Sequence, residues 1–312
     1  MSLLGPAAST LVGLVALWLG ARWLVTAASR LARTAGIPPL IVGLTVVAFG
    51  TSAPEIVVGV EAALEGRGAI AVGNVVGSNA FNLGAILGAL AIISPFRVAD
   101  TLVRRDAVAM AAATGVGIAV LVNLHVSRTE GIFLLACLVA YLAWLARSAR
   151  DSDTGAVEPE RSGTNRHPGV DALVLVVGLV LVGLGGRLLV QGAVELARAG
   201  GVSEWLIGVT VVAGGTSLPE AAASVVAARR AEVGLAAGNV IGSNVFNLLG
   251  VLGVSAVAAP LVVGASVRSG LWWLAALTAV SAVLLGTGRR LTRLEGVALV
   301  LSVAGFWVLA AG

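Results

Sequence analysis

Lysine is absent from this 312-residue chain, and charged residues of every kind make up only 12% of it. Hydrophobic residues make up 58%, and the mean hydropathy is +1.01. Soluble domains carry about twice this share of charge, so the sequence predicts a protein that crosses a membrane several times. We interpret the pI near 10.8 as a product of membrane topology and not as a sign of nucleic-acid binding.

Cysteine and histidine are also scarce, which excludes several kinds of chemistry. The single cysteine, Cys137, cannot form a disulfide within the chain. His125 and His167 lie in predicted loops with no matching ligands nearby. The apolar spans offer neither a nucleophile with a base nor paired histidines for a metal. We therefore expect no enzyme activity, no catalytic residue and no cofactor.

Ten apolar segments are long enough to cross a bilayer as helices, which takes about 20 residues each. They cover residues 3–29, 38–64, 69–94, 105–123, 130–147, 170–197, 204–228, 232–259, 269–287 and 293–311. The sequence thus predicts an all-α membrane protein with ten transmembrane helices.

The chain contains an internal duplication. Residues 42–95 and 207–260 align without a gap and are identical at 27 of 54 positions. The offset is constant, since 220 − 55 = 165 for two glutamates, and Arg22 and Arg187 keep the same spacing. The ten spans therefore divide into two repeats of five.

The two repeats are residues 1–148 and 169–312, and a polar linker at 149–168 joins them. An odd number of spans makes the second repeat enter the membrane from the opposite side, so the repeats should be inverted. With the N-terminus outside, the predicted cytoplasmic loops hold fourteen arginines and the outer loops four. Because positive charge favours the cytoplasm, we predict a multi-pass protein of the cell membrane with extracellular or periplasmic termini and a cytoplasmic linker.

Each repeat carries a motif that should break a helix inside the membrane, GTSAPE ending at Glu55 and GTSLPE ending at Glu220. Pro54 and Pro219 cannot donate to the carbonyl four residues earlier. A broken helix at bilayer depth exposes backbone groups that need a polar or ionic partner. A carboxylate at that depth costs roughly 3 kcal/mol or more, so two of them in matching settings indicate a function.

Oxygen-bearing side chains surround both glutamates. Thr51 and Ser52 lie about one helical turn from Glu55. The segment GNVVGSNAFN places three more on one helix face, and the second repeat has the matching set: Asn74, Ser78, Asn82, Thr216, Ser217, Asn239, Ser243 and Asn247. A pseudo-two-fold axis would gather two carboxylates with hydroxyl and amide oxygens, a cage suited to a hard cation such as calcium.

Simpler explanations exist for parts of this pattern. Ser52 with Glu55, and Ser217 with Glu220, each match a capping box, in which the serine caps the helix and the glutamate bonds back to the serine amide. The many small residues match tight helix packing. Neither explanation accounts for two acids at bilayer depth, each followed by an Asn-Gly-Ser-Asn type of segment.

The paired GTSxPE and GNxxGSNxFN segments resemble the two alpha repeats of the calcium/cation antiporter superfamily, specifically the sodium/calcium exchanger family in its compact prokaryotic form. The resemblance covers all ten predicted spans. It implies an antiporter that exchanges Ca²⁺ for Na⁺ by alternating access, with the first and sixth spans sliding across the other eight. Its partners would be these ions and the lipid bilayer, with no obligatory protein partner.

The resemblance also implies the ion ligands. The central site would use the carboxylates of Glu55 and Glu220 and the backbone carbonyls of Ala48 and Ala213 before each break. The flanking ligands would be Thr51, Ser52, Ser78 and Asn82 from the first repeat and Thr216, Ser217, Ser243 and Asn247 from the second. Some family members carry aspartate where this chain has Asn247, so the cage here has two formal charges rather than three.

The coupling ion stays open at this point. Sodium is the family default, but two neighbouring carboxylates can take up protons instead, which leaves a proton-coupled antiporter of Ca²⁺ or another cation as the alternative. A cation channel could use the same carboxylates, although inverted repeats with broken helices favour a carrier. Stoichiometry, flux direction, selectivity among divalent cations and oligomeric state do not follow from the sequence.

Overall fold

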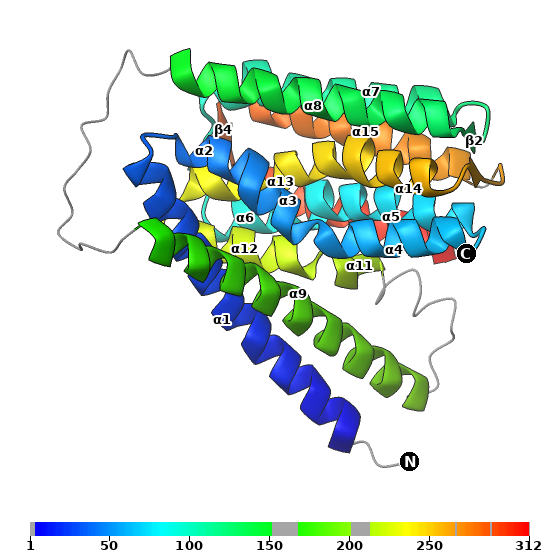
Figure 1. Cartoon of the computed structure of the whole chain (residues 1–312), viewed down its shortest axis with the longest axis horizontal. Helices are drawn as coiled ribbons and strands as arrows, with labels where there is room; N and C mark the ends of the chain where they lie inside the picture. Colours follow the sequence, from blue (N-terminus) through cyan, green and yellow to red (C-terminus); the bar gives the residue numbers. More distant parts are fainter. Residues whose placement is uncertain (1–3, 152–167, 201–212, 266, 288, 312) are drawn as a thin grey trace.

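The computed structural model describes residues 4–151, 168–200, 213–265, 267–287 and 289–311. Helices account for nearly all of these residues, and they pack as an elongated bundle (Figure 1). Labels beginning with η denote π-helical segments, in which the helix is locally wider than an α-helix.

The first repeat is a series of long or interrupted helices joined by short loops. Its elements are α1 (Leu4–Thr34), α2 (Pro39–Val42), η1 (Gly43–Val47), α3 (Ala48–Thr51), α4 (Ala53–Leu64), α5 (Gly68–Phe81), η2 (Asn82–Ile86), α6 (Leu87–Ile93), β1 (Phe96–Arg97), η3 (Leu102–Ala107), α7 (Val108–Leu121), β2 (His125–Val126) and α8 (Arg128–Asp151).

The second repeat follows the same order. Its described elements are α9 (Pro168–Ala199), α11 (Ala213–Thr216), α12 (Leu218–Arg229), α13 (Val233–Val245), η6 (Phe246–Val251), α14 (Leu252–Ala258), β3 (Leu261–Val262), α15 (Val267–Gly286), β4 (Arg290–Leu291) and α16 (Arg293–Ala311).

Within the described residues, each predicted span coincides with one of these helices or with a row of consecutive helices. Six described helices are long and apolar enough to cross a bilayer, and the bent pair Pro39–Thr51 and Ala53–Leu64 makes up to seven. The predicted all-α multi-pass fold is thus confirmed, while the count of ten spans stays a prediction. Residues 204–212 of the seventh predicted span, and linker residues 152–167, lie outside the described residues.

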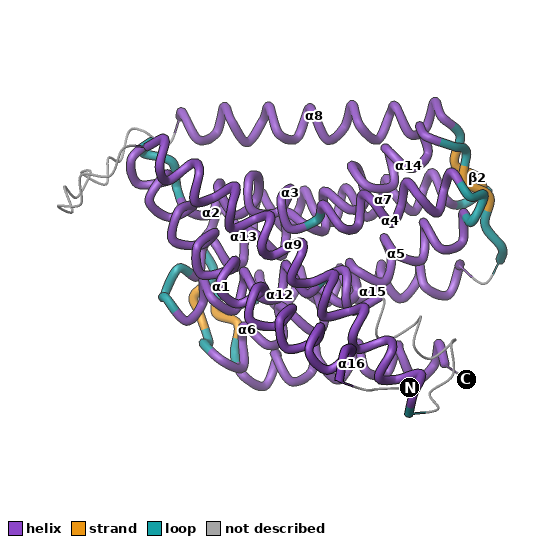
Figure 2. Tube along the Cα trace, turned by 60° about the horizontal axis from the view of Figure 1, so that its bottom comes forward, coloured by secondary structure: helices purple, strands orange, loops and turns teal. Residues whose placement is uncertain are grey.

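Two very short antiparallel ladders depart from the purely helical prediction. β1 pairs with β4, and β2 pairs with β3. The 165-residue offset of the duplication converts β1 into β3 and β2 into β4, so it converts one ladder into the other. The ladders lie at opposite ends of the bundle (Figure 2). They tie the two repeats together in a symmetric way.

Helices α1 and α9 are counterparts in the duplication, and they pack side by side (Figure 1). A Cβ atom on Gly20 would lie 2.7 Å from the backbone nitrogen of Val182, and one on Gly185 would lie 2.5 Å from that of Leu17. Glycine therefore permits a backbone approach that a larger residue would block. A later residue of α1 thus meets an earlier residue of α9, since Gly178 lies against Leu24 and Gly13 against Leu189, so the counterparts run antiparallel and the repeats are inverted.

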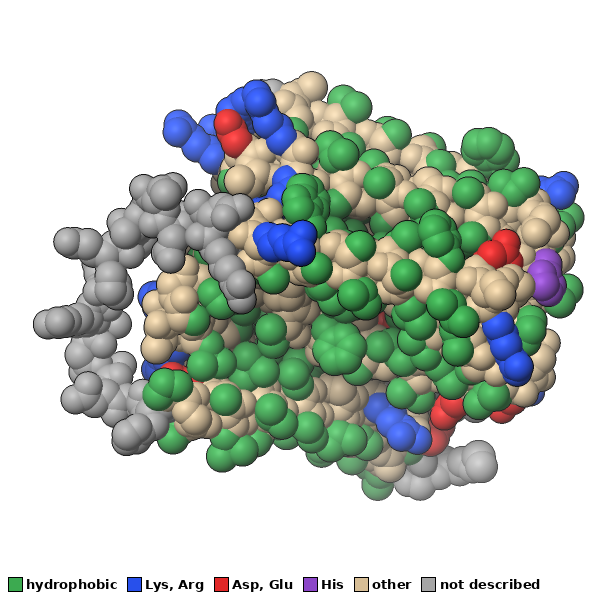
Figure 3. Space-filling view, turned by 45° about the horizontal axis from the view of Figure 1, so that its top comes forward, with side chains coloured by type: hydrophobic (Ala, Val, Ile, Leu, Met, Phe, Trp, Pro, Cys, Tyr) green, Lys and Arg blue, Asp and Glu red, His purple; other side chains and the backbone are tan. Residues whose placement is uncertain are grey.

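The centre of the bundle is formed by the counterpart stretches Gly68–Ile93 and Val233–Ala258. In their most apolar windows 67% and 89% of the residues are buried, against 28% for Arg128–Ser148 at the periphery. Hydrophobic side chains cover much of the middle of the face seen in Figure 3. Exposed residues of this kind include Trp272 and Leu173. The outer surface of the bundle is thus apolar, as contact with lipid requires, and the polar motifs lie in the two buried central stretches.

The start of the first described helix and the end of the last one lie toward the same end of the bundle (Figure 1). Figure 1 shows α1 beginning and α16 ending toward one end of the bundle, whereas α8 finishes and α9 starts at the other. The side of the membrane that each terminus faces stays a prediction.

Candidate ion-binding site

Both proline motifs break their helices at a serine, as the sequence predicts. The helix axes of Pro39–Thr51 and Ala53–Leu64 differ by 45°, and Ser52 lies at the junction with φ −81° and ψ 7°. Ser217 separates α11 from α12 with φ −90° and ψ 7°. The two repeats therefore carry the same break in nearly the same backbone conformation.

The serines at the breaks bond to the glutamates of the opposite repeat. Ser52 Oγ donates to Glu220 Oε1 at 2.9 Å, and Ser217 Oγ donates to Glu55 Oε1 at 3.2 Å. Both carboxylates are fully buried. These reciprocal bonds bring the two halves together at one centre.

The capping-box explanation is wrong for both motifs. Neither Ser52 nor Ser217 makes a side-chain cap bond to its own helix. The break turns each hydroxyl away from the helix that follows it and toward the other repeat, where a carboxylate accepts it.

A second hydroxyl reaches each carboxylate from the central helices. Ser78 Oγ donates to Glu55 Oε1, and Ser243 Oγ donates to Glu220 Oε1, both at 3.4 Å. Each Oε1 thus accepts one hydroxyl from its own repeat and one from the other. Hydroxyl donors stabilise the charged form of a buried carboxylate.

Asn74 and Asn239 form hydrogen bonds with the broken helices. Each donates from Nδ2 to the backbone carbonyl of the glutamate in its own repeat at 3.2 Å. Their amide oxygens accept bonds from threonine hydroxyls of the opposite repeat, from Thr216 at 3.4 Å and from Thr51 at 3.2 Å. These asparagines therefore position the start of α4 and α12 and connect the repeats a second time.

Asn82 and Asn247 lie in the π-helical segments η2 and η6 and are fully buried. Both side-chain amide atoms of each residue lack a hydrogen-bond partner among the described residues, and so does Oε2 of Glu55 and of Glu220. An unsatisfied buried polar atom costs about 1–3 kcal/mol. Such atoms suit a bound ion, and π-helical turns are frequent at functional sites.

The carbonyl of Ala48 lies at the break of the first repeat. Ala48 O accepts the amide of Ser52 at 3.0 Å and the hydroxyl of Thr51 at 3.4 Å, so it lies directly at the break. Ala213 is the first described residue of α11. A role for these carbonyls as ion ligands stays a prediction.

The described side chains at the centre offer oxygen ligands and no sulfur ligand. The part of the chain that the structure describes holds no group of three or more His, Cys, Asp or Glu side chains placed to share a metal. The centre instead offers two carboxylates with hydroxyl and amide oxygens. Hard cations such as Ca²⁺ and Na⁺ prefer oxygen ligands, whereas zinc and other transition metals favour nitrogen or sulfur.

The family description "Sodium/calcium exchanger protein" matches residues 6–147 and 170–312 of this chain. The match includes both repeats and both glutamate motifs. The chain belongs to the sodium/calcium exchanger family.

Individual relatives agree with this membership. The putative antiporter CaxA of Alkalimonas amylolytica is 40% identical over 304 residues, which cover 95% of each chain. The sodium/calcium exchanger MaX1 of Methanosarcina acetivorans is 31% identical over 338 residues, covering 96% of each. The crystal structure of the sodium-calcium exchanger NCX_Mj soaked with Na⁺ and Sr²⁺ superposes with a TM-score of 0.85 at 30% identity, covering 99% of this chain and 98% of that one. This exchanger-family chain therefore shares the whole fold of a solved exchanger.

Proposed function

We propose that the protein is a secondary active antiporter that exchanges Ca²⁺ for Na⁺ by alternating access. The observation that carries this proposal is the reciprocal pair of bonds from Ser52 to Glu220 and from Ser217 to Glu55. They place two acids from inverted repeats in one buried centre. The naming of MaX1 as a sodium/calcium exchanger, and crystals of NCX_Mj soaked with Na⁺ and Ca²⁺, support the choice of ions.

The proposed ligands follow the symmetry of the centre. Glu55 and Glu220 supply the negative charge, and Asn82 and Asn247 supply unsatisfied amide oxygens. The remaining proposed ligands are Thr51, Ser52, Ser78, Thr216, Ser217 and Ser243, with the carbonyls of Ala48 and Ala213.

The charge of the centre explains why transport would be an exchange and not a leak. Two bare carboxylates at bilayer depth are strongly disfavoured because they are desolvated without a counter-charge. One Ca²⁺, or monovalent cations in its place, offsets that charge. The binding site therefore moves from one side of the membrane to the other only when it holds cations. Each Ca²⁺ that is released on one side must be replaced by Na⁺ before the site can return.

Calcium uptake into vesicles tests this function and separates its rivals. The full chain is reconstituted, and radioactive Ca²⁺ uptake is measured with an outward Na⁺ gradient, with an outward proton gradient, and with neither. Uptake that depends on the Na⁺ gradient supports the proposal. Uptake on the proton gradient without Na⁺ identifies a proton-coupled antiporter, and uptake with neither gradient identifies a channel.

We also propose that both termini face outward and that the linker is cytoplasmic, on the basis of the arginine distribution. A Cys137→Ser chain with a single Gly155→Cys substitution in the linker tests this orientation. A membrane-impermeant maleimide should label it in inside-out vesicles and not in intact cells. Labelling in intact cells would reverse the topology.

A further inference from the structure

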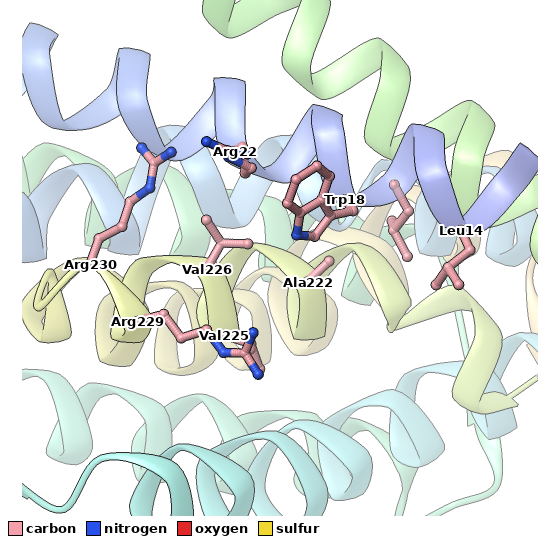
Figure 4. Close-up of a pocket in the computed structure, with 9 residues that line it drawn as sticks. Leu14, Trp18, Arg22, Ala222, Val225, Val226, Arg229 and Arg230 are labelled. Carbon is pink, nitrogen blue, oxygen red and sulfur yellow. The ribbon is translucent and has the colours of Figure 1, made fainter.

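A cleft of about 330 Å³ opens between α1 and α12 (Figure 4). One part of it is lined by Arg22, Arg229 and Arg230, and the rest is apolar: Leu14, Leu17, Trp18, Ala222, Val225 and Val226. In Figure 4 Arg230 lies toward one end of the cleft and Leu14 toward the other. The cleft thus combines a cationic end with an apolar trough.

Other arginines near this end of α1 have acidic partners. Arg30 pairs with Asp171 at 3.5 Å, and Arg33 pairs with Glu232 at 3.1 Å. Among the described residues, none of the ion pairs involves the three arginines of the cleft. No described carboxylate therefore lies within 4.0 Å of their guanidinium groups.

The other contacts of the cleft arginines are neutral. The guanidinium of Arg22 lies over the ring of Trp18 at 4.6 Å from the centroid, and Arg230 donates to the hydroxyl of Thr26. Burial, and then repulsion by the positive charge of Arg22, lower the pKa of Arg230, and the negative charge of Glu232 opposes this only in part. An anion between them would relieve this repulsion.

The position of the cleft identifies the anion. All three arginines are exposed, and so is nearly half of Trp18, so the cleft is open at the outer surface of the bundle. Helix α12 ends at Arg229. The cationic end of the cleft lies near this helix end, on the side of Arg30 and Arg33. The apolar lining of the cleft extends from there along both helices toward Leu14. A phospholipid has this same division between a charged headgroup and an apolar chain.

We propose that the cleft binds one anionic phospholipid, with its phosphate between Arg22 and Arg230 and one acyl chain along Leu14, Trp18 and Val226. Such a lipid would contact both α1, which packs against α9, and α12. The lipid comes from the leaflet on the arginine-rich side of the membrane.

Trp18 allows direct detection of this lipid. The full chain is reconstituted in phosphatidylcholine vesicles that contain a fixed share of phosphatidylglycerol. In one sample the phosphatidylglycerol has brominated acyl chains, and in the other an equal mole fraction of the phosphatidylcholine is brominated instead. Tryptophan fluorescence should be quenched more by brominated phosphatidylglycerol. The excess quenching should disappear in Trp18→Phe, and Arg22→Gln and Arg230→Gln should each weaken the preference about fivefold.

Arg293→Gln is the matched control, because Arg293 is an exposed arginine at the start of α16 and does not line the cleft. It should keep the excess quenching. Equal quenching of the wild-type chain by both lipids overturns the proposal without any variant. Loss of the excess quenching in Arg293→Gln would indicate a general attraction of the lipid to surface arginines. Loss of the excess quenching in the wild-type chain on addition of inorganic phosphate would indicate a site for free anions. Either outcome overturns the lipid assignment.

Discussion

Ser52 and Glu220 are 168 residues apart in the chain, yet the Ser52 hydroxyl donates to the Glu220 carboxylate at 2.9 Å inside the bundle. The bond joins the break of one repeat to the acid of the other. Its counterpart, from Ser217 to Glu55, measures 3.2 Å. The acids are thus held by the inverted partner, so neither repeat can form the centre alone.

The two glutamates should be individually essential for transport. Glu55→Gln and Glu220→Gln each remove half of the charge that would bind Ca²⁺. Truncating one member of a buried charged pair costs about 3 kcal/mol, which corresponds to roughly a 100-fold loss. The initial rate of Na⁺-driven Ca²⁺ uptake should fall by at least this factor. Glu61→Gln, at an exposed position on α4, should leave the rate unchanged. Normal exchange in either core variant would refute the site.

The break serines should contribute equally to Ca²⁺ affinity. Ser52→Ala and Ser217→Ala each remove one hydroxyl from the carboxylate of the opposite repeat. Each serine oxygen is also a proposed Ca²⁺ ligand, so the loss of one such contact with a charged group, about 1.5 kcal/mol, should weaken Ca²⁺ binding about tenfold in calorimetry. Ser302→Ala serves as the control, because its hydroxyl bonds to Leu299 O in the outer helix α16. A variant that loses stability but keeps its affinity would show that the hydroxyl only joins the repeats and does not contribute to Ca²⁺ binding.

Much of the fold could be predicted because it repeats. The 27 identities between the halves, the proline motifs and the apolar segments indicate the spans, the breaks at Ser52 and Ser217, and the inversion. The packing of α1 against α9 was not predicted, although Gly20 and Gly185, which permit it, occupy equivalent positions in the duplication.

The partners across the site could not be predicted from local spacing. Ser52 and Glu55 satisfy the sequence pattern of a capping box, and only the three-dimensional arrangement shows that the hydroxyl bonds to the other repeat. The π-helical turns at Asn82 and Asn247 also lack a periodic signal, because the neighbouring residues are apolar on every side. The shared offset of 165 residues is the one feature that pointed to cross-repeat contacts.

The unsatisfied asparagines should act as ion ligands and not as packing residues. Asn82→Ala and Asn247→Ala each remove an amide oxygen without a partner among the described residues. Both variants should weaken Ca²⁺ binding about tenfold while losing little thermal stability, because no internal hydrogen bond is broken. Asn79→Ala is the matched control, since its amide donates to Val75 O at 2.9 Å in its own helix. It should lower stability and preserve affinity. The reverse pattern would exclude Asn82 and Asn247 from the site.

The close approach of α1 and α9 should tolerate no added methyl group. In Gly185→Ala the new Cβ would lie 2.5 Å from the backbone nitrogen of Leu17, so the helices must separate. Overpacking of this kind costs about 1–3 kcal/mol, and thermal unfolding in detergent should occur at a lower temperature. Gly183→Ala provides a control in the same helix, because a Cβ there meets no atom within 4 Å. Gly20→Ala should behave like Gly185→Ala by symmetry. Equal unfolding temperatures for Gly183→Ala and Gly185→Ala would mean that the two helices do not pack as the glycines require.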